Sequence, residues 1–291
     1  MEEQMMVLKN ISCFDPVHIF ECGQCFRWNQ QQDGSYIGIV RQNVIQVRKV
    51  NNTISITSMG KDPLEKLCQE YFDLTTDYDQ MKQILSTIDD YLAQSVTFGQ
   101  GIRILKQDVW ETLISFIISA NNNIPRIKGI IERLSAYYGT KIEWNGVSYY
   151  TFPTPEQLSR ATIPDLRKLG LGFRDKRVYQ TTQMVQNKTL NLEQLQKEGD
   201  LQQLRTTLLQ VPGVGPKVAD CVLLFGFQKR EVFPVDVWVR RVMNEIYLHE
   251  TEEEKVTKEK IQQIARQKYG NLAGIAQQYL FYWEREKSKV S

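Results

Sequence analysis

Polar and apolar residues alternate between Ser35 and Met59, and turn signals flank and interrupt this segment at Asp33-Gly34 and Asn51-Asn52. Alternate side chains of a strand lie on opposite faces of a sheet. The segment therefore predicts an antiparallel sheet. Its alternating apolar positions are Ile37, Ile39, Ile45, Val47, Ile54 and Ile56.

From Asp62 onward the apolar residues recur every three or four positions, which is the period of a helix. Gly and Pro loops separate the helices that this period predicts. We place a domain boundary near Phe98-Gly99, with an α+β domain over residues 1–98 and an all-α domain over residues 99–291. The strongest predicted helices are Val109–Ala120, Ile127–Tyr138, Pro155–Thr162, Leu201–Gln210, Val218–Phe227, Val237–Leu248 and Lys255–Tyr269.

Length and composition agree with two folded domains. The chain has 291 residues, more than a single core usually holds, and 42% of them are hydrophobic and 24% charged. No apolar run approaches the ~20 residues of a membrane span, and the acidic N-terminus is unlike a secretory signal. An odd count of five cysteines is typical of a reducing compartment. We therefore expect an intracellular protein with no membrane partner, in the cytoplasm or nucleoid, or in the nucleus of a eukaryote.

The formal net charge of +2 conceals an uneven distribution along the chain. Residues 1–100 contain 8 Lys and Arg against 13 Asp and Glu, a net charge of −5, whereas residues 101–291 contain 28 against 21, a net charge of +7. A basic second domain favours an anionic partner, although a solvated helical surface gives the same count.

Residues 201–227 predict a helix-hairpin-helix. Gly213 and Gly215 permit positive φ angles in the turn, and Pro216 suits the first turn of the next helix. Glycines here let a phosphate reach backbone N–H groups at a helix N-terminus, so such a hairpin binds a DNA backbone without reading its sequence. An ordinary tight connection between helices is the alternative. A P-loop fits poorly, because Val218 stands where that motif has Ser or Thr.

Lys217 and Asp236 are candidate catalytic residues. A lysine in the first turn of a helix faces the positive end of the helix dipole, which disfavours the ammonium form, and the neutral amine is the nucleophile that forms a Schiff base. Asp236 precedes a predicted helix, where it would cap backbone N–H groups and could also stabilise positive charge that develops on a sugar. A solvated lysine and a plain N-cap aspartate are the structural alternatives, and position by itself does not separate them.

Further motifs extend this pairing into a resemblance that covers nearly the whole chain. The string from Val211 to Asp236 resembles the helix-hairpin-helix, Gly-Pro-Asp superfamily of DNA base-excision glycosylases. The resemblance implies a TATA-binding-protein-like antiparallel sheet domain followed by an all-α helix-hairpin-helix glycosylase domain. The blocks that resemble the 8-oxoguanine DNA glycosylase/AP lyase branch are Gly23–Trp28, Asn121–Arg126, Leu169–Arg174 and Ala273–Phe281.

By this resemblance Lys217 is the nucleophile and Asp236 is the aspartate that supports it electrostatically. Lys217 would attack C1′ of the damaged nucleotide and release the base, and the Schiff base would then undergo β-elimination that nicks the strand. The base must first be flipped out of the duplex. Cys221 and Phe281 match residues that sandwich the flipped base, and Gln277 matches a residue that hydrogen-bonds its edge.

Gly23 matches the residue whose backbone carbonyl accepts a hydrogen bond from N7–H of 8-oxoguanine. Guanine has no such hydrogen, and its N7 is an acceptor that would face the carbonyl oxygen unpaired. A residue without a side chain lets the backbone come this close to a base. Without the resemblance, Gly23 would be an ordinary loop glycine.

Four residues match those that contact the DNA around the vacated position. Asn121, Arg126 and Arg174 match residues that fill the space and read the opposite cytosine. Phe173 matches an aromatic wedge that is inserted into the base stack. Taken alone, the same positions fit a polar turn and a buried aromatic residue.

The iron-sulfur branch of the superfamily has a cluster of four cysteines after the catalytic region. This chain does not fit that branch, because no cysteine follows Cys221. Cys22 and Cys25 have the spacing of a zinc or redox pair, but no second pair completes a metal site. We therefore expect no metal and no cofactor, apart from a structural cation that carbonyls of the hairpin could hold. Trp238 departs from the family pattern, which usually has His at this position.

Together these features predict a monomeric, bifunctional DNA glycosylase/AP lyase that excises 8-oxoguanine from damaged double-stranded DNA. A glycosylase for another damaged base is the nearest alternative. A non-catalytic hairpin protein that only binds bent or damaged DNA is the second alternative.

Overall fold

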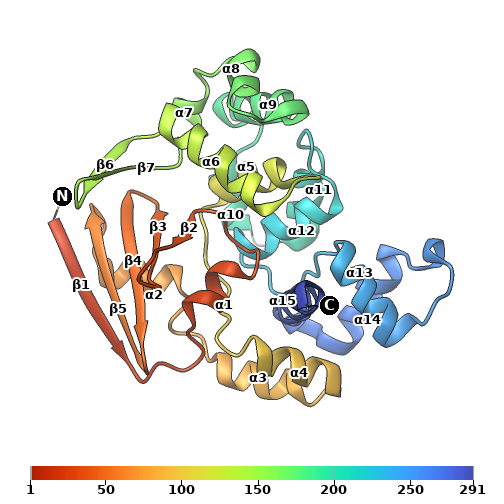
Figure 1. The fold of residues 1–291 in the computed structure, drawn as a ribbon. Coiled ribbons are helices and arrows are strands. Elements are labelled where there is room, and N and C mark those ends of the chain that lie inside the picture. The colour runs from red at the N-terminus through yellow and green to blue at the C-terminus, as the bar shows by residue number, and fades with distance from the viewer. Residues whose placement is uncertain (1, 199, 291) are drawn as a thin grey trace.

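A five-stranded antiparallel sheet forms one body of the molecule and a set of helices forms the other (Figure 1). The computed structural model describes residues 2–198 and 200–290. The strand order is β1-β5-β4-β3-β2, so the first strand of the chain pairs with the fifth. The strands are β1 (Glu2–Lys9), β2 (Trp28–Gln30), β3 (Tyr36–Val40), β4 (Asn43–Val50) and β5 (Thr53–Gly60).

The sheet predicted from the alternating apolar residues is confirmed as β3, β4 and β5, and residues such as Ile56 are fully buried. The alternation misses β1, because every position of Met5, Met6, Val7 and Leu8 is apolar and the period of two is hidden. Met5 and Val7 point outward, with 71% and 43% of their surface exposed. Met6 and Leu8 pack against the core beneath the sheet.

Helices make up most of the chain after the sheet. Among the described residues, none of these helices is both long enough and apolar enough to cross a membrane. The helices are α1 (Pro16–Glu21), α2 (Leu64–Tyr71), α3 (Tyr78–Ser86), α4 (Asp90–Phe98), α5 (Val109–Ser119), α6 (Ile124–Tyr138), α7 (Pro155–Leu158), α8 (Ile163–Lys168), α9 (Asp175–Gln186), α10 (Leu192–Glu198), α11 (Leu201–Leu209), α12 (Pro216–Phe225), α13 (Val237–Met243), α14 (Lys258–Tyr269) and α15 (Ala273–Val290), with shorter 3-10 or π-helical turns η1 (Gly172–Arg174), η2 (Asn244–Leu248), η3 (Glu253–Lys255) and η4 (Gly270–Leu272).

Two predicted helices differ from the observed ones for local reasons. The predicted helix Pro155–Thr162 ends early, because the Thr162 side chain caps the next helix by accepting a hydrogen bond from the Asp165 backbone N–H. The predicted helix Val237–Leu248 is α-helical only over α13 and continues as the π-helical turn η2. In both cases the apolar period runs on through a change in backbone geometry.

A two-stranded hairpin joins the helical part of the chain to the sheet. It consists of β6 (Lys141–Trp144) and β7 (Val147–Tyr150). The indole Nε1 of Trp144 donates a hydrogen bond of 3.0 Å to the Glu3 carboxylate on β1, and Trp144 packs with Val44 of the sheet. The part of the chain after residue 99 therefore contains strands as well as helices.

The expected boundary at Phe98-Gly99 follows the end of α4 but does not separate the two hydrophobic cores. Leu85, Leu92 and Val96 on α3 and α4 belong to the core of the helical body. Leu105, beyond the expected boundary, packs in the core of the sheet body instead. The chain thus passes between the bodies more than once, and each body is completed by residues from the other side of the boundary.

A buried carboxylate joins the two bodies. Asp73 follows α2 and is fully buried, and it accepts hydrogen bonds from the Tyr78 hydroxyl at 3.0 Å and from Arg230. The Lys106 ammonium lies 2.7 Å from its other oxygen. Burial by itself would raise the pKa of the Asp73 carboxyl, but hydrogen bonds from Lys106 and Thr76 and the charge of Arg230 outweigh burial and hold this pKa below its ordinary value.

We predict that Asp73→Asn lowers the free energy of unfolding at pH 7 by about 2 kcal/mol, less than for a fully buried pair because both cations reach solvent. A lowered carboxyl pKa contributes stability above the ordinary pKa of Asp, and this contribution is lost as the pH falls. Urea unfolding of both proteins should therefore show a difference at pH 7 that shrinks below about pH 4. Asp33→Asn, which removes an exposed ion pair with Arg48, is the control and should change the midpoint little. A difference that grows in acid would contradict this prediction.

Candidate active site

A narrow cavity lies where α12, α15 and the loop after α1 meet. The structure brings together at this cavity all six residues that were predicted as catalytic or as pocket residues. These residues come from distant parts of the chain, so only the packing of the two bodies assembles them. The lining residues are Gly23, Phe116, Lys217, Cys221, Phe225, Pro234, Asp236, Gln277, Gln278 and Phe281.

Lys217 occupies the second position of α12, as the helix-hairpin-helix motif predicts. Pro216 opens this helix, and Gly215 precedes it as an N-cap that has no capping side chain. The Lys217 Nζ lies 5.2 Å from the centre of the Phe116 ring, over its face. The sequence does not single out Phe116, because helix α5 is buried on nearly every side and its apolar residues mark no one face.

Asp236 combines the two roles that its position allows. As the N-cap of α13, its carboxylate accepts a hydrogen bond of 2.9 Å from the Val239 backbone N–H. It also lines the cavity beside Lys217. Burial raises the pKa of the Asp236 carboxyl, although the Val239 N–H and the charge of Lys217 act in the opposite direction. A carboxylate that is buried beside an amine is suited to stabilising positive charge.

Cys221 lies one helical turn after Lys217 and is buried. Burial raises the pKa of its thiol to about 11, although the neighbouring Lys217 opposes this shift. The thiol is therefore protonated at neutral pH, whereas nucleophilic attack by cysteine requires the thiolate. Cys221 supplies a wall of the cavity, and Lys217 is the better candidate for the nucleophile.

Gly23 and the Phe281 ring lie close together in the lining of the cavity. Gly23 has a φ angle of +82°, and a Cβ atom placed on it would lie 2.8 Å from Cε1 of the Phe281 ring. A side chain at this position would therefore be strained and would also displace the ring. On the same helix as Phe281, the buried Oε1 atom of Gln277 has no hydrogen-bond partner within the described part of the chain. An acceptor without a partner is available to N–H groups of a ligand.

The hairpin glycines differ in their surroundings. Gly213 has a φ angle of +85°, and a Cβ atom on it would lie 2.4 Å from Cδ of Arg177. Around Gly215, a Cβ atom would meet no heavy atom within 4 Å. The N-terminus of α12 is therefore open to an anion at Gly215, as expected of a hairpin that binds a phosphate backbone.

Phe173 and its neighbours form an exposed aromatic and basic surface beside the hairpin. The Phe173 side chain is 53% exposed. The guanidinium carbons of Arg174 and Arg177 lie 4.2 and 5.0 Å from the centre of its ring. Because Arg177 also contacts the hairpin at Gly213, this surface is continuous with the hairpin. An exposed aromatic ring between cations fits a wedge for nucleic acid better than a core residue.

Arg174 is placed differently from the residues around it. Its side chain is 1% exposed, and its guanidinium donates to the backbone carbonyls of Ala120, Asn121 and Leu171. Arg174 therefore holds the loop after α5, and its role in reading an opposite base stays a prediction. Asn121, with a φ angle of +51°, and Arg126 are both exposed near this loop.

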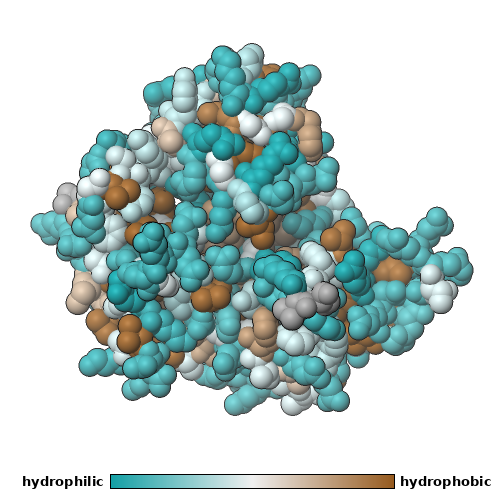
Figure 2. Space-filling model, in the orientation of Figure 1, coloured by the Kyte–Doolittle hydropathy of each residue, from teal (hydrophilic) through white to brown (hydrophobic). Residues whose placement is uncertain are grey.

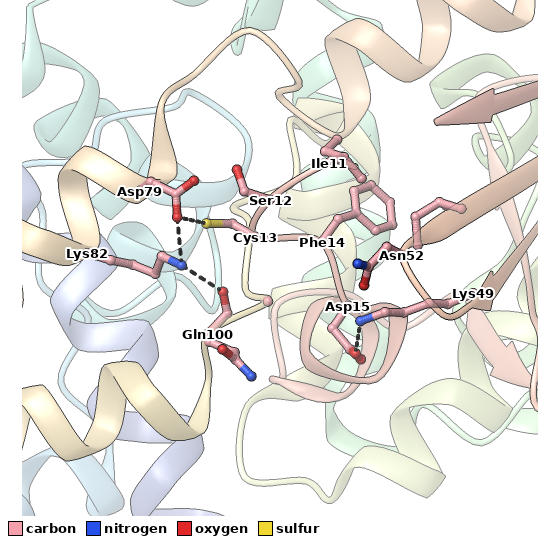
Figure 3. Close-up of a pocket in the computed structure, with 12 residues that line it drawn as sticks. Ile11, Ser12, Cys13, Phe14, Asp15, Lys49, Asn52, Asp79, Lys82 and Gln100 are labelled. Atoms are coloured by element: carbon pink, nitrogen blue, oxygen red, sulfur yellow. Dashed lines mark hydrogen bonds and ion pairs between the residues drawn. The ribbon is translucent and has the colours of Figure 1, made fainter. Parts of the chain in front are cut away.

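A larger hollow lies elsewhere, between the sheet body and α3 (Figure 3). Its charged groups are paired with one another, Lys49 with Asp15 at 2.7 Å and Lys82 with Asp79 at 3.0 Å. The Cys13 thiol donates to Asp79, and burial raises the pKa of this thiol. Because these charged groups already have partners, the smaller cavity at Lys217 is the better candidate for the active site.

Within the described residues, no group of three or more His, Cys, Asp or Glu side chains could hold a metal ion.

We predict that Gly23→Ala is more destabilising than Gly34→Ala. Gly34 has a φ angle of +79° but open space around it, so both variants incur the cost of a left-handed alanine, about 1–2 kcal/mol. Only Gly23→Ala also forces a methyl group against Phe281, which should cost about 1 kcal/mol more. Urea unfolding of the two variants measures this difference directly. Equal losses of stability would contradict the close contact between Gly23 and Phe281.

Comparison with known proteins identifies the family. The family model of the 8-oxoguanine DNA glycosylase N-terminal domain matches residues 6–113, and the model of the HhH-GPD superfamily of base excision DNA repair proteins matches residues 114–267. A crystal structure of the Clostridium acetobutylicum 8-oxoguanine glycosylase/lyase, in complex with double-stranded DNA containing cytosine opposite to 8-oxoG, is 42% identical. It covers 99% of this chain and 98% of that one, with a TM-score of 0.92.

Two curated relatives agree with this structure. The N-glycosylase/DNA lyase of Saccharomyces cerevisiae is 35% identical over 260 residues, which are 79% of this chain and 67% of that protein. The probable N-glycosylase/DNA lyase of Methanothermobacter thermautotrophicus is 34% identical over 238 residues, 75% of this chain and 74% of that protein. The chain therefore belongs to the HhH-GPD superfamily of base excision DNA repair proteins, in the branch that carries the 8-oxoguanine DNA glycosylase N-terminal domain.

Proposed function

We propose that the protein excises 8-oxoguanine from double-stranded DNA and then nicks the strand 3′ to the lesion. The observation that carries this proposal is the cavity that combines the Lys217 amine, the Asp236 carboxylate and the unpartnered Gln277 oxygen. The relatives named N-glycosylase/DNA lyase and 8-oxoguanine glycosylase/lyase support the same activity. Lys217 supplies the nucleophile, so the reaction needs no metal and no organic cofactor.

Recognition of the base depends on polar groups at the edge of the cavity. We assign to the Gly23 carbonyl the hydrogen bond from N7–H that 8-oxoguanine offers and guanine lacks. The free Oε1 of Gln277 is suited to N–H groups on the Watson–Crick edge of a purine. Cys221 and Phe281 both line this cavity, and we assign to them the two walls between which the flipped base enters.

The chemical steps follow from the position of Lys217. Its Nζ forms a bond to C1′ while the C1′–N9 bond breaks, and the departing base takes up the proton that the amine loses. The C1′–O4′ bond then opens, O4′ takes up a proton from water, and an iminium remains between C1′ and Nζ. Loss of a proton from C2′ breaks the C3′–O3′ bond and expels the 3′ phosphate, which nicks the strand. Water finally hydrolyses the imine and frees Lys217.

Asp236 acts on the charge that these steps create. Breaking the C1′–N9 bond leaves positive charge on the sugar, and the iminium is positive as well. The Asp236 carboxylate lines the same cavity as Lys217 and is fixed by the hydrogen bond that it accepts from the Val239 N–H. A negative charge that is already fixed in place stabilises such states without the reorganisation that water would need.

Duplex DNA would lie across the hairpin and the Phe173 surface. Gly215 offers an open helix N-terminus to a phosphate, and Phe173 offers a wedge to the base stack. Asn121 and Arg126 are exposed beside it and could contact cytosine opposite the lesion. We further propose that the protein acts as a monomer inside the cell, since one chain supplies every group that this reaction uses.

We predict that the wild-type protein forms a covalent complex with a duplex containing 8-oxoguanine when borohydride reduces the imine. Lys217→Gln has no amine at this position and should form none. Lys289→Met removes an exposed cation far along α15 and is the control that should still be trapped. Denaturing gel electrophoresis detects the crosslink. An undiminished crosslink from Lys217→Gln would overturn the proposed nucleophile, and the absence of any wild-type crosslink would overturn the Schiff-base mechanism.

Asp236→Asn should lower the single-turnover rate of excision by about 100-fold or more, because an amide keeps the size of the side chain but not its charge. DNA binding should change far less, since Asp236 lies inside the cavity rather than on the Phe173 surface. Rapid-quench kinetics and a binding titration on the same duplex measure the two quantities. An unchanged rate of excision would contradict the electrostatic role.

Excision should also depend on pH through Asp236. Burial raises the pKa of this carboxyl above its ordinary value of 3.8, and protonation removes the charge that the reaction needs. The single-turnover rate should therefore fall as the pH is lowered, with a midpoint above that of an exposed aspartate. Asp236→Asn, measured over the same pH range, should lack this decline. A wild-type rate that rises in acid would contradict the assignment.

A further inference from the structure

Two buried side chains of α15 hold the backbone that leads into Gly23. The Gln278 amide Nε2 donates a hydrogen bond to the Cys22 carbonyl, and the Arg285 Nη2 donates to the Glu21 carbonyl. Gln278 is 2% exposed and Arg285 is 9% exposed. In Figure 1, α1 and α15 accordingly lie next to each other, between the sheet and the last helices. Two consecutive carbonyls are thus fixed by one helix.

The same helix carries the pocket residues Gln277 and Phe281. The guanidinium carbon of Arg285 lies 5.3 Å from the centre of the Phe281 ring. Its Nη1 lies 3.4 Å from the place that a Cβ atom of Gly23 would take. Arg285 therefore touches both the loop and the ring that meet across the cavity, although it does not itself line the cavity.

The far side of the loop is fixed as well. Gln24 is fully buried, and its Nε2 donates to the carbonyls of Ile19 and Arg103 at 2.9 and 2.8 Å. Its Oε1 accepts a hydrogen bond of 2.9 Å from the Leu105 backbone N–H. Gly23 is therefore the one residue between these two anchored segments that has the backbone freedom of glycine.

We propose that Gln278 and Arg285 are positioning residues for base discrimination. They fix the peptide units before Gly23, so that the Gly23 carbonyl keeps the direction that an N7–H donor requires. This inference rests on the proposed function. A hydrogen bond weakens steeply when its geometry deviates, so a discriminating contact made by a glycine loop needs outside support.

A purely structural role for the two side chains makes a different prediction. Cleavage of a duplex that already contains an abasic site requires Lys217 and Asp236 but no base in the pocket. Damage to the fold would lower both this cleavage and the excision of 8-oxoguanine. Loss of the support for Gly23 would lower excision alone and would weaken the preference for the damaged base.

The experiment compares Gln278→Met and Arg285→Met with the wild type. Both substitutions keep much of the apolar contact and remove the hydrogen-bond donor. Lys66→Met is the control, because it removes an exposed cation on α2, outside α15 and outside the loop before Gly23. Each protein is assayed in single turnover on 8-oxoguanine opposite cytosine and on a preformed abasic site. Its affinities for 8-oxoguanine and guanine duplexes are also measured.

We expect excision by Gln278→Met and Arg285→Met to fall by about 10- to 100-fold, the scale of one or two lost hydrogen bonds to a carbonyl. Abasic-site cleavage should change by less than about threefold, which shows that the fold and Lys217 are intact. The affinity ratio between 8-oxoguanine and guanine duplexes should fall. Arg285→Lys, which keeps a donor, should recover part of the loss.

A parallel fall of both activities would overturn the positioning role in favour of a structural one. Unchanged excision, or an unchanged preference between the two duplexes, would overturn it as well. A wild-type protein that cleaves the abasic duplex but leaves 8-oxoguanine in place would instead contradict the proposed function. The activity of the wild-type protein on 8-oxoguanine therefore distinguishes failure of the proposed function from failure of the positioning role.

Discussion

The contact between Gly23 and the Phe281 ring is the constraint on which the site depends. One residue follows the first helix and the other lies on the last helix, so the contact requires the two ends of the fold to be fixed against each other. Buried polar groups do this more specifically than apolar packing, because hydrogen bonds and ion pairs have preferred directions. Asp73 joins the two bodies through Lys106 and Arg230, and Gln24 anchors the loop. The interior between the bodies is therefore polar in places, even though most of the core is apolar.

Burial also determines what each group in the cavity can do. It keeps the Cys221 thiol protonated, so that the thiol is a wall and not a competing nucleophile. It raises the pKa of Asp236, while the Val239 N–H and Lys217 favour the carboxylate. The outer face of the molecule is different in character, since Figure 2 shows a mostly hydrophilic surface with scattered apolar side chains. Phe173 is an exposed aromatic residue, and the guanidinium groups of Arg174 and Arg177 lie over its ring.

Local patterns in the sequence predict much of the fold, and their failures have local causes. The alternation that reveals β3 to β5 is absent from Met5–Leu8, so β1 is hidden. Thr162 ends one predicted helix by capping the next, although the apolar period continues. The predicted boundary at Phe98-Gly99 does not coincide with the division between the two cores, because apolar side chains of α3 and α4 pack with helices that lie far along the chain. Such packing cannot be inferred from a short window of sequence.

Some residues of the candidate site have a local signal in the sequence, and others do not. Lys217 and Asp236 carry local signals, a helix start and an N-cap, whereas Gly23, Gln277 and Phe281 are identified only through the family resemblance. Phe116 and Arg285 have neither kind of signal, and Gln278 lies in a resembling block that assigns it no role. Phe116 stands in a helix that is buried almost throughout, and Gln278 and Arg285 bond carbonyls more than 250 positions earlier in the chain. Arg174 is the opposite case. It lies in the resembling block Leu169–Arg174, but its guanidinium donates hydrogen bonds to backbone carbonyls of the loop after α5.

The most direct test of this account is a crystal structure of the Lys217→Gln variant bound to a duplex containing 8-oxoguanine, in which the base cannot be cleaved. The account predicts a flipped base between Cys221 and Phe281, with N7 within about 3 Å of the Gly23 carbonyl oxygen and with the Glu21 and Cys22 carbonyls still bonded to α15. An 8-oxoguanine that stays stacked in the duplex, or that enters the cavity with N7 directed away from Gly23, would contradict it.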